Sequence, residues 1–281
     1  FPGAMDTQAV EAMMQDGKAL QAGTSHFLGQ NFAKASEIRY LSAEGREEYA
    51  WTTSWGVSTR LIGGLVMAHG DDDGFVCPPR VAPAHVVILP VIPKEEQREK
   101  VMQYCAALRE ALQSVPYCGD PLRVELDDRD LRGGEKVWSW IKNGIPIRLE
   151  VGPRDIDQDA VFMGRRDRGP RDKESVGREQ FLADVGAVLD SIHQSLYARA
   201  KALRDAKTRA VSSKEEFYAF FEDENAGFAV AHYAENEEVE ARLQDELKVT
   251  ARCIPFEQPA PAPCIFTGEA DAPVAVFGKA Y

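Results

Sequence analysis

The first histidine of the sequence, His26, is the first candidate for a functional side chain. It follows Thr24 and Ser25 in the run QAGTSH, a stretch poor in core-forming residues. Two interpretations are open for this imidazole. It could bind a substrate, or it could be a structural histidine that a backbone carbonyl satisfies at the end of a strand, which is the commoner case for an isolated histidine.

Charged residues form three further candidates. Arg60 follows GVST, where it could bind an anion or simply be solvated or paired with a carboxylate. The run of aspartates at 71–73 lacks the alternating ligands and distal Glu of a calcium loop, so we expect a solvated turn. The stretch RRDRGPRDK (165–173) is the densest basic cluster, and it is either a solvated hairpin or a contact to phosphates or base edges.

Composition limits the possible classes of protein. The 281 residues are 44% hydrophobic and 28% charged, as in an ordinary globular protein of two or three domains. A net charge of −12 argues against non-specific coating of nucleic acid but allows a local basic face. No apolar run approaches the roughly 20 residues of a membrane span, and no leader opens the chain. Because it begins at Phe1, we expect it to be part of a longer polypeptide.

The cysteines do not suggest a disulfide framework or an obvious metal site. Their number is odd and their spacing irregular, which suits reduced thiols in a cytosol. Cys253 and Cys264 lack a CxxC pair and are weak evidence for zinc. The five residues are Cys77, Cys105, Cys118, Cys253 and Cys264.

The sequence pattern of the first 76 residues predicts an antiparallel sheet followed by a helix. Residues 8–14 and 20–26 are predicted strands joined by the turn QDGK, and residues 49–54 alternate with period two. Residues 56–70 have helical spacing, with Ser58 or Thr59 as an N-cap, and end at Gly70.

Residues 77–85 contain three prolines and are predicted to be a linker. A buried strand at 85–92 and an amphipathic helix at 94–113 follow. Alternating strands and helices imply a partly parallel sheet covered on its faces. The remaining expected elements are strands at 122–126, 145–151 and 159–166, a short helix at 134–144, a long helix at 178–211, an acidic section at 214–246 and a proline-rich spacer at 255–263.

Several of these stretches, in order and over essentially the whole chain, resemble the prolyl-tRNA synthetase family. They are ALQAGTSHFLGQNFAKA, WTTSWGVSTRLIGGLVMAHGDDDG followed by VCPPRVAP, GIPIRLEVGPRD and the final FGKAY. The resemblance is to the archaeal/eukaryote-like branch of this class IIa aminoacyl-tRNA synthetase family. It implies an α+β and α/β multidomain fold. Residues 1–76 would be the C-terminal half of a class II catalytic domain with an antiparallel sheet, 77–190 an α/β anticodon-binding domain with a mixed sheet, and 191–281 a small α+β C-terminal domain.

The resemblance also assigns roles to residues of the first domain. GVSTR matches class II motif 3, so Arg60 would lie against ATP, with Ser58 a neighbouring nucleotide contact. A guanidinium suits this role because it offers a planar fork to phosphate oxygens. Gln21 and Thr24 match positions that contact ATP, and His26 matches the histidine that lines the proline pocket. Small neighbours would then let nucleotide and proline approach the sheet.

In the anticodon-binding domain, the resemblance places four residues near the guanines of the proline anticodon, namely Arg148, Arg154, Asp155 and Lys173. Arg and Lys donate to guanine acceptors, and a carboxylate accepts from the guanine amino group. The family has an acidic residue directly after the second tryptophan of this region, where this chain has Ile141. Guanine recognition is therefore expected to be arranged differently or to be weaker.

The last domain differs from its family in one respect. Its terminal Tyr281 would reach toward the catalytic site with its free carboxylate. The family often binds zinc there through four cysteines, and the matching positions here are Ala234, Val239, Cys264 and Thr267. One thiolate cannot complete a tetrahedral site, so the sequence predicts no zinc, with packing or hydrogen bonds in its place.

The activity implied is that of a cytoplasmic, homodimeric proline–tRNA ligase that forms prolyl-adenylate from L-proline and ATP with magnesium and charges tRNA(Pro). No membrane partner is expected, and no residue is nominated for covalent catalysis, because both steps depend on positioning and charge stabilisation. Class II motifs 1 and 2 would precede Phe1, so the chain alone is expected to be inactive. The alternative is a synthetase-derived tRNA-binding or regulatory paralogue, which Ile141 and the missing cysteines favour and which the TSH run, motif 3 and Tyr281 oppose.

Overall fold

The computed structural model describes all 281 residues and divides into two compact units. The first unit comprises Phe1–Ala68 and Ala202–Tyr281, and the second comprises His69–Lys201. No helix in the structure combines the length and apolar character that crossing a membrane requires.

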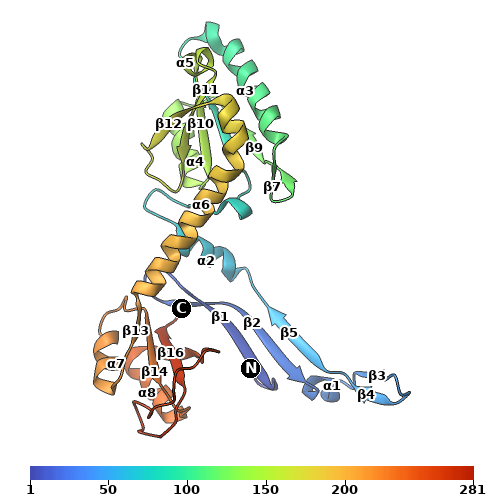
Figure 1. The fold of residues 1–281 in the computed structure, drawn as a ribbon, viewed down its shortest axis with the longest axis vertical. Coiled ribbons are helices and arrows are strands. Elements are labelled where there is room, and N and C mark those ends of the chain that lie inside the picture. The colour runs from blue at the N-terminus through green and yellow to red at the C-terminus, as the bar shows by residue number, and fades with distance from the viewer. The chain divides into compact units, whose positions relative to one another are not determined.

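The first unit contains two main sheets (Figure 1). The N-terminal sheet has the order β1-β2-β5 and is antiparallel, and the C-terminal sheet has the order β13-β14-β16-β15. The strands are β1 (Asp6–Met13), β2 (Ala19–Gly29), β3 (Arg39–Leu41), β4 (Glu47–Tyr49), β5 (Thr52–Gly56), β13 (Thr208–Ala210), β14 (Phe228–His232), β15 (Val249–Cys253) and β16 (Val274–Lys279). The helices are α1 (Asn31–Ala35), α2 (Arg60–His69), α7 (Lys214–Phe221) and α8 (Glu237–Leu247).

The expected hairpin at the start of the chain is confirmed. Its turn needs Gly17, because this residue has φ of +82° and an added Cβ would lie 2.7 Å from the carbonyl oxygen of Asn225. The third strand begins later than expected, since Tyr49 belongs to the separate β3–β4 hairpin. The helix expected after Gly56 is confirmed as α2.

The second unit is built on a five-stranded mixed sheet of order β12-β11-β10-β6-β9. β10, β6 and β9 are parallel, whereas β11 and β12 continue the sheet in antiparallel fashion. The partly parallel sheet expected from the sequence is therefore confirmed. Its strands are β6 (Val86–Pro90), β9 (Val124–Leu126), β10 (Ile147–Val151), β11 (Ala160–Arg165) and β12 (Lys173–Gly177), and a small hairpin is made of β7 (Pro116–Tyr117) and β8 (Asp120–Pro121).

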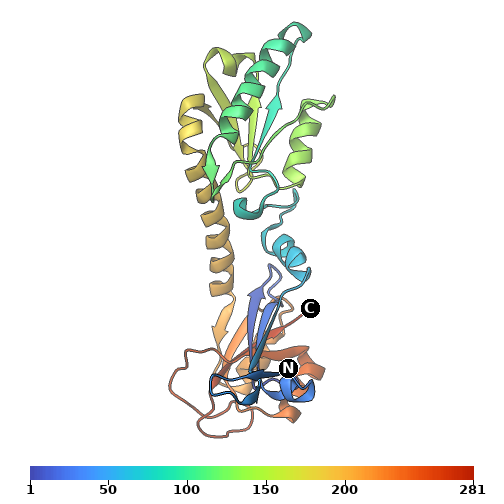
Figure 2. The same cartoon turned by 90° about the vertical axis from the view of Figure 1, so that its right-hand side faces the viewer.

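Helices cover both faces of this sheet (Figures 1 and 2). α3 (Arg98–Gln113) and α6 (Arg178–Ala206) pack against the face that carries Ile147 and Leu149. α4 (Gly133–Lys142) packs against the opposite face through Val137 and Trp140, which contact Val87 and Leu89. The short elements are α5 (Pro153–Asp157) and the 3-10 turns η1 (Pro79–Val81) and η2 (Glu95–Gln97).

The proline-rich segment 77–85, predicted to be a linker, has no regular structure except the turn η1, but it is packed, because Cys77, Ala82 and Ala84 are buried. Arg123, 41 residues away in the sequence, donates to the carbonyl oxygen of Ala82 at 2.8 Å. Two predicted helix bounds were wrong. The long helix ends at Ala206 rather than 211, since the chain then extends as β13. The helix expected from 94 begins at Arg98, after the turn η2.

Asp127 connects the end of β9 to α4. Its side chain is fully buried and accepts from Arg129 Nη2 at 2.7 Å and from the indole of Trp140 at 2.7 Å. The hydrogen bonds from Arg129 hold the pKa of this carboxyl at about 2, well below its usual 3.8. A carboxylate that is stabilised in the folded protein contributes stability above its unfolded pKa and loses that contribution as the pH falls through its folded pKa.

Replacing Asp127 by Asn is therefore expected to lower the free energy of unfolding by about 1–3 kcal/mol near neutral pH. The deficit relative to the wild type should shrink between about pH 4 and about pH 2, where the wild-type carboxylate itself becomes protonated. Urea unfolding across this pH range measures both effects. Asp128→Asn is the charge-matched control, because Asp128 is exposed. A deficit that is the same at pH 2 as at pH 7 would contradict this role of the Asp127 charge.

Candidate functional site

Three of the residues predicted to bind substrates lie on one face of the N-terminal sheet. Cross-strand pairs point to the same side of a sheet, and Gln21, Thr24 and His26 lie opposite Glu11, Ala9 and Thr7. Alternation along β2 alone would separate residue 21 from residues 24 and 26. A β-bulge at Ala22, opposite the step from Val10 to Glu11, inserts one extra residue and brings the three to the same face.

A groove of about 530 Å³ lies beside the start of β2. It brings together Gln21, Arg60 and Tyr281, which come from β2, from the first residue of α2 and from the end of the chain. The Ser58 hydroxyl accepts from the backbone N–H of Arg60 at 3.3 Å and so stabilises the first turn of α2. The guanidinium of Arg60 is exposed and makes no ion pair, so it is available to an anionic ligand. The groove is lined by Ala19, Leu20, Gln21, Thr59, Arg60, Gly63, Gly64, Met67, Arg252, Ala280 and Tyr281.

Tyr281 is held at this groove by both backbone and side-chain contacts. Ala280 forms a parallel bridge with Ala19 at the start of β2. The Tyr281 hydroxyl donates to Asp16 at 2.6 Å, and Lys18 lies over its ring at 5.4 Å. Burial, together with the hydrogen bond to Asp16, raises the pKa of Tyr281 to about 12. The phenol is therefore a fixed neutral donor at physiological pH.

An ion pair that sequence analysis missed lies at the same groove. Arg252 on β15 donates to Glu11 on β1 through Nε at 3.1 Å and Nη2 at 2.9 Å. The two side chains are only 16% and 6% exposed, respectively. Gln21 also donates to Glu11, at 3.5 Å. Because 241 residues separate the partners, no local pattern could have indicated this pair.

His26 does not line the groove. Its ring is buried, stacks on Phe1 with centroids 4.3 Å apart, and has Nδ1 3.0 Å from the Thr7 hydroxyl. A side-chain hydroxyl therefore contacts the imidazole, in place of the backbone carbonyl that the structural alternative invoked. Thr24 lines a second groove of about 560 Å³, together with Trp55 and Phe256.

In the second unit, Arg148 is a buried cation without a partner. It is 2% exposed, makes no hydrogen bond or ion pair, and has its Nε buried and unsatisfied. Burial lowers the pKa of this guanidinium to about 10, with Arg166 adding to the effect and Glu150 opposing it. Room for it exists because its cross-strand neighbour is Gly164, where an added Cβ would lie 3.1 Å from Arg148 Nη2. A buried unpaired charge costs free energy, which is typical of a binding site.

Lys173 lies in the same row of the sheet. Arg148, Gly164 and Lys173 are neighbours across β10, β11 and β12, so Arg148 and Lys173 share one face about 10 Å apart. Lys173 pairs with Glu150 and has its Nζ 5.7 Å from the ring centre of Phe162. Glu150 was missed in the sequence, although its position two residues after Arg148 on a strand was a signal for a shared face.

Arg154 and Asp155 lie away from this row. Both are on α5, beyond the end of β10, and so about 10 Å or more along the strand from Arg148. The Asp155 carboxylate accepts from the backbone N–H of Gly152 at 2.8 Å and caps α5. Arg154 is exposed and without an ion pair. The structure therefore brings together two of the four predicted anticodon contacts.

An ion pair joins the acidic turn to the basic run. Arg166 donates to both carboxylate oxygens of Asp71, at 2.7 and 2.5 Å. The hydrogen bonds from Arg166 lower the pKa of Asp71. Arg165 forms a similar bidentate ion pair with Asp167, through Nε at 3.0 Å and Nη2 at 2.9 Å. The turn is exposed at Asp71 and Asp72, as expected, but Asp71 is also ion-paired, and the first two arginines of the basic run are buried and paired with aspartates.

The positions that match the zinc cysteines of the resembled family do not fit a metal. Cys264 is the one thiol among them, and Ala234, Val239 and Thr267 supply no thiolate or imidazole. Burial alone would raise the pKa of Cys264, but hydrogen bonds from the Thr267 hydroxyl and from backbone N–H groups, including that of Ala234, lower it. No group of three or more His, Cys, Asp or Glu side chains in the structure is placed to hold a metal ion.

Comparison with known proteins identifies two domains. Residues 85–187 match the family model of the anticodon binding domain, and residues 214–281 match that of the prolyl-tRNA synthetase C-terminal domain. These two stretches are therefore similar to an anticodon-binding domain and to a prolyl-tRNA synthetase C-terminal domain, respectively.

Curated relatives match the whole chain. They include proline–tRNA ligase 2 of Anaeromyxobacter dehalogenans, 55% identical, and the proline–tRNA ligases of Bdellovibrio bacteriovorus and Rhodopirellula baltica, 53% and 50% identical. In each case the alignment covers 100% of this chain but only 56–57% of the relative. The chain thus spans little more than half the length of these ligases.

The Glu11–Arg252 pair generates a stability prediction. Arg252→Ala leaves the Glu11 carboxylate buried without its cation and is expected to cost about 3–5 kcal/mol in the free energy of unfolding. Replacing both residues by Met removes both charges and should recover most of that loss, because well-packed apolar pairs often substitute for buried ion pairs. Denaturant unfolding of the two variants measures this. A cost below about 1 kcal/mol for Arg252→Ala would mean that the pair does not hold β1 to β15.

Proposed function

We propose that this chain is the C-terminal part of a prolyl-tRNA synthetase that activates L-proline with ATP and magnesium and transfers the prolyl group to tRNA(Pro). Support comes from proline–tRNA ligases of up to 55% identity that align with all of it. The geometric observation that carries the proposal is the groove shared by Gln21, Arg60 and Tyr281. Three segments far apart in the sequence meet there, and the family resemblance assigns each of them to the adenylation site.

In this proposal, residues 1–76 belong to a class II catalytic domain. Neither matched family model extends to residues 1–84, so this assignment rests on the aligned relatives and on the antiparallel sheet. Arg60 neutralises the polyphosphate of ATP with Ser58 beside it, and Gln21 and Thr24 contact the nucleotide. His26, farther along the same face of β2, lines the proline pocket. The bridge between Ala19 and Ala280 supports the proposal that the Tyr281 carboxylate lies beside this site.

The anticodon assignment rests mainly on Arg148. Guanine presents two acceptors that a guanidinium can contact together, and Arg148 is a buried guanidinium without a partner of its own. Lys173, on the same face, is a second donor. Arg154 and Asp155 remain proposed contacts at the far end of β10, with Asp155 also capping α5.

The finer assignments are proposals of the same kind. We place the domain boundaries at 76/77 and 190/191, and the enzyme in the archaeal/eukaryote-like branch, to which the extra C-terminal domain is suited. We further propose that the whole enzyme is a cytoplasmic homodimer without structural zinc. The alternative, a paralogue that binds tRNA without charging it, has Ile141 in its favour, whose buried side chain offers guanine no carboxylate.

Proline-dependent ATP–pyrophosphate exchange by the complete polypeptide tests the activity. Arg60→Ala should lower kcat/KM for ATP by about 100-fold, because it removes a charged donor to the polyphosphate, and Arg60→Lys should lose less. Arg46→Ala is the matched control, since Arg46 is an exposed arginine of the β3–β4 turn outside the groove. Exchange together with charging of tRNA(Pro) supports the enzyme, whereas exchange without charging supports the paralogue. Absence of exchange in the wild type would refute the catalytic proposal.

Arg148 generates a prediction in which stability and binding change in opposite directions. Arg148→Met removes a buried, unpaired charge at similar volume and is expected to raise the free energy of unfolding by about 1 kcal/mol or more. The same variant should bind tRNA(Pro) about fivefold to a hundredfold more weakly, because a bidentate contact to guanine is lost. Denaturant unfolding and RNA titration of the 281-residue chain measure the two effects.

Arg165→Met is the matched control for this prediction. Arg165 is also buried on this sheet, but Asp167 neutralises it, so its removal should destabilise the protein. If Arg148→Met lowered stability as Arg165→Met does and left RNA binding unchanged, Arg148 would be a structural residue and not an anticodon contact.

A further inference from the structure

Two tryptophans lie two positions apart on α4 and have different surroundings. The indole of Trp140 donates to Asp127 at 2.7 Å, and its ring packs with Val87 and Leu89. Trp138 is 46% exposed, and neither its indole N–H nor its ring has a partner. Trp140 thus has a structural role, whereas the ring of Trp138 is exposed to solvent.

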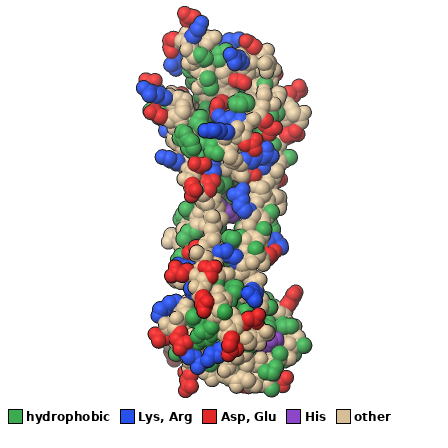
Figure 3. Space-filling view, turned by 90° about the vertical axis from the view of Figure 1, so that its left-hand side faces the viewer, with side chains coloured by type: hydrophobic (Ala, Val, Ile, Leu, Met, Phe, Trp, Pro, Cys, Tyr) green, Lys and Arg blue, Asp and Glu red, His purple; other side chains and the backbone are tan.

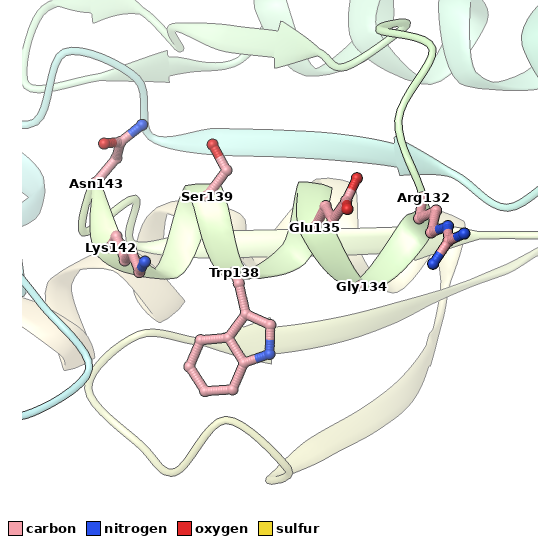
Figure 4. Close-up of a pocket in the computed structure, with 7 residues that line it drawn as sticks. All are labelled: Arg132, Gly134, Glu135, Trp138, Ser139, Lys142 and Asn143. Carbon is pink, nitrogen blue, oxygen red and sulfur yellow. The ribbon is translucent and has the colours of Figure 1, made fainter.

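Grooves lie on both sides of Trp138. One, of about 750 Å³, lies along α4 and includes Arg132 and Lys142 (Figure 4). The other, of about 550 Å³, lies between α4 and the loop before β12 and includes Arg171 and Lys173. Figure 4 shows the Trp138 ring projecting from α4 away from Ser139 and Glu135. A flat ring that borders two grooves can contact a planar ligand on its face.

Three cations without an ion pair lie around Trp138. Arg132, Lys142 and Arg171 are exposed and make no ion pair. Three carboxylates line the grooves as well, those of Glu135, Asp73 and Asp172, and the last of these is 3.9 Å from Arg168. Lys/Arg and Asp/Glu side chains are interspersed over the face drawn in Figure 3, so attraction of phosphates depends on such local groups.

An exposed aromatic ring among cations matches the chemistry of an unpaired nucleotide. Bases in RNA loops stack on aromatic side chains, while Lys and Arg follow the phosphates. A base-paired duplex does not offer base faces in this way, so the ligand must be single-stranded at this point. Lys173, which shares a groove with Trp138, also lies in the row with Arg148, whose guanidinium lacks a partner. The Trp138 ring, Lys173 and Arg148 are thus on one side of the sheet.

We propose that Trp138 is a stacking surface for one unpaired base of an RNA loop bound on the α4 side of the sheet. The inference rests on the proposed function, in which this domain binds the anticodon loop of tRNA(Pro). It goes further by naming a contact that recognises a base face, in addition to the contacts of Arg148 and Lys173 with base edges. The free indole N–H lets the ring approach the loop without breaking any protein hydrogen bond.

The test is titration of the 281-residue chain with an anticodon stem-loop RNA of tRNA(Pro), followed by intrinsic fluorescence and by calorimetry. Trp138→Ala should weaken binding about fivefold to a hundredfold, the range for loss of one stacked base. Trp138→Phe should keep most of the affinity, whereas Trp138→Leu, apolar but not aromatic, should not. Because no charge is removed, the dependence of affinity on salt should stay as in the wild type, whereas Lys142→Ala should reduce that slope.

The stacked base is located by replacing one loop nucleotide at a time with an abasic site. One replacement should weaken wild-type binding and have little further effect in Trp138→Ala, which is the coupling expected of a direct contact. Tyr197→Ala is the control, because Tyr197 is an exposed aromatic on α6, the helix that packs on the opposite face of the sheet. The affinity of the Tyr197→Ala variant for the stem-loop should equal that of the wild type. The thermal stability of Trp138→Ala should also match that of the wild type.

The outcomes separate this inference from the function on which it rests. If the wild type does not bind the stem-loop, the anticodon proposal fails and the stacking proposal fails with it. If the wild type binds and Trp138→Ala binds equally well, the anticodon proposal stands and the stacking proposal is overturned. The stacking proposal is also overturned if Trp138→Leu binds as well as Trp138→Phe, or if no abasic position couples to Trp138.

Discussion

The backbone pairing of β2 is the constraint on which the geometry of the first unit depends. This strand is paired on both sides, with β1 and with β5, and its first residue also bridges to Ala280. Its one extra residue at Ala22 shifts the register so that Gln21 lies on the face of Thr24 and His26. The groove at its start is completed by α2 and by the end of the chain. Apart from β15, the segments that line this groove are therefore positioned by their pairing with β2 or by direct connection to a strand paired with it.

The buried arginines of the second unit differ in how their charge is compensated. Arg165 and Arg166 are buried and fully compensated by aspartates, so they stabilise the sheet. Arg148 is buried at a cost in stability, because no hydrogen bond or ion pair holds its guanidinium and its Nε has no partner, although Glu150 favours its charge from the same face. Trp138 likewise exposes its apolar ring to solvent. Residues that reduce stability without a structural benefit are those that a ligand is expected to satisfy.

The C-terminal domain is organised around aromatic packing. Phe217, Phe266 and Phe277 pack edge to face, with centroids 5.0–6.0 Å apart. The Tyr233 hydroxyl donates to Glu240 at 2.9 Å and accepts from the N–H of Asn236, which fixes the loop between Ala234 and Val239. Such contacts can replace the constraint of a metal. They also give β15 and β16 a rigid base, from which Arg252 and Tyr281 reach the groove.

Features that depend on neighbouring residues could be read from the sequence alone. An amphipathic pattern predicted α3, the order of strands and helices predicted α4 and β10, and the resemblance assigned roles to Arg60, Arg148 and Tyr281. Which of these residues lie together became clear only in the folded chain. β12 was missed because Lys173–Gly177 is mostly polar and exposed, and its strand geometry comes from pairing with β11. The partners of Arg166, Lys173 and Arg252 are also distant in the sequence. A charged side chain pairs with whatever the fold brings near it, and a register shift changes which residues those are, so no local sequence pattern indicates the partner.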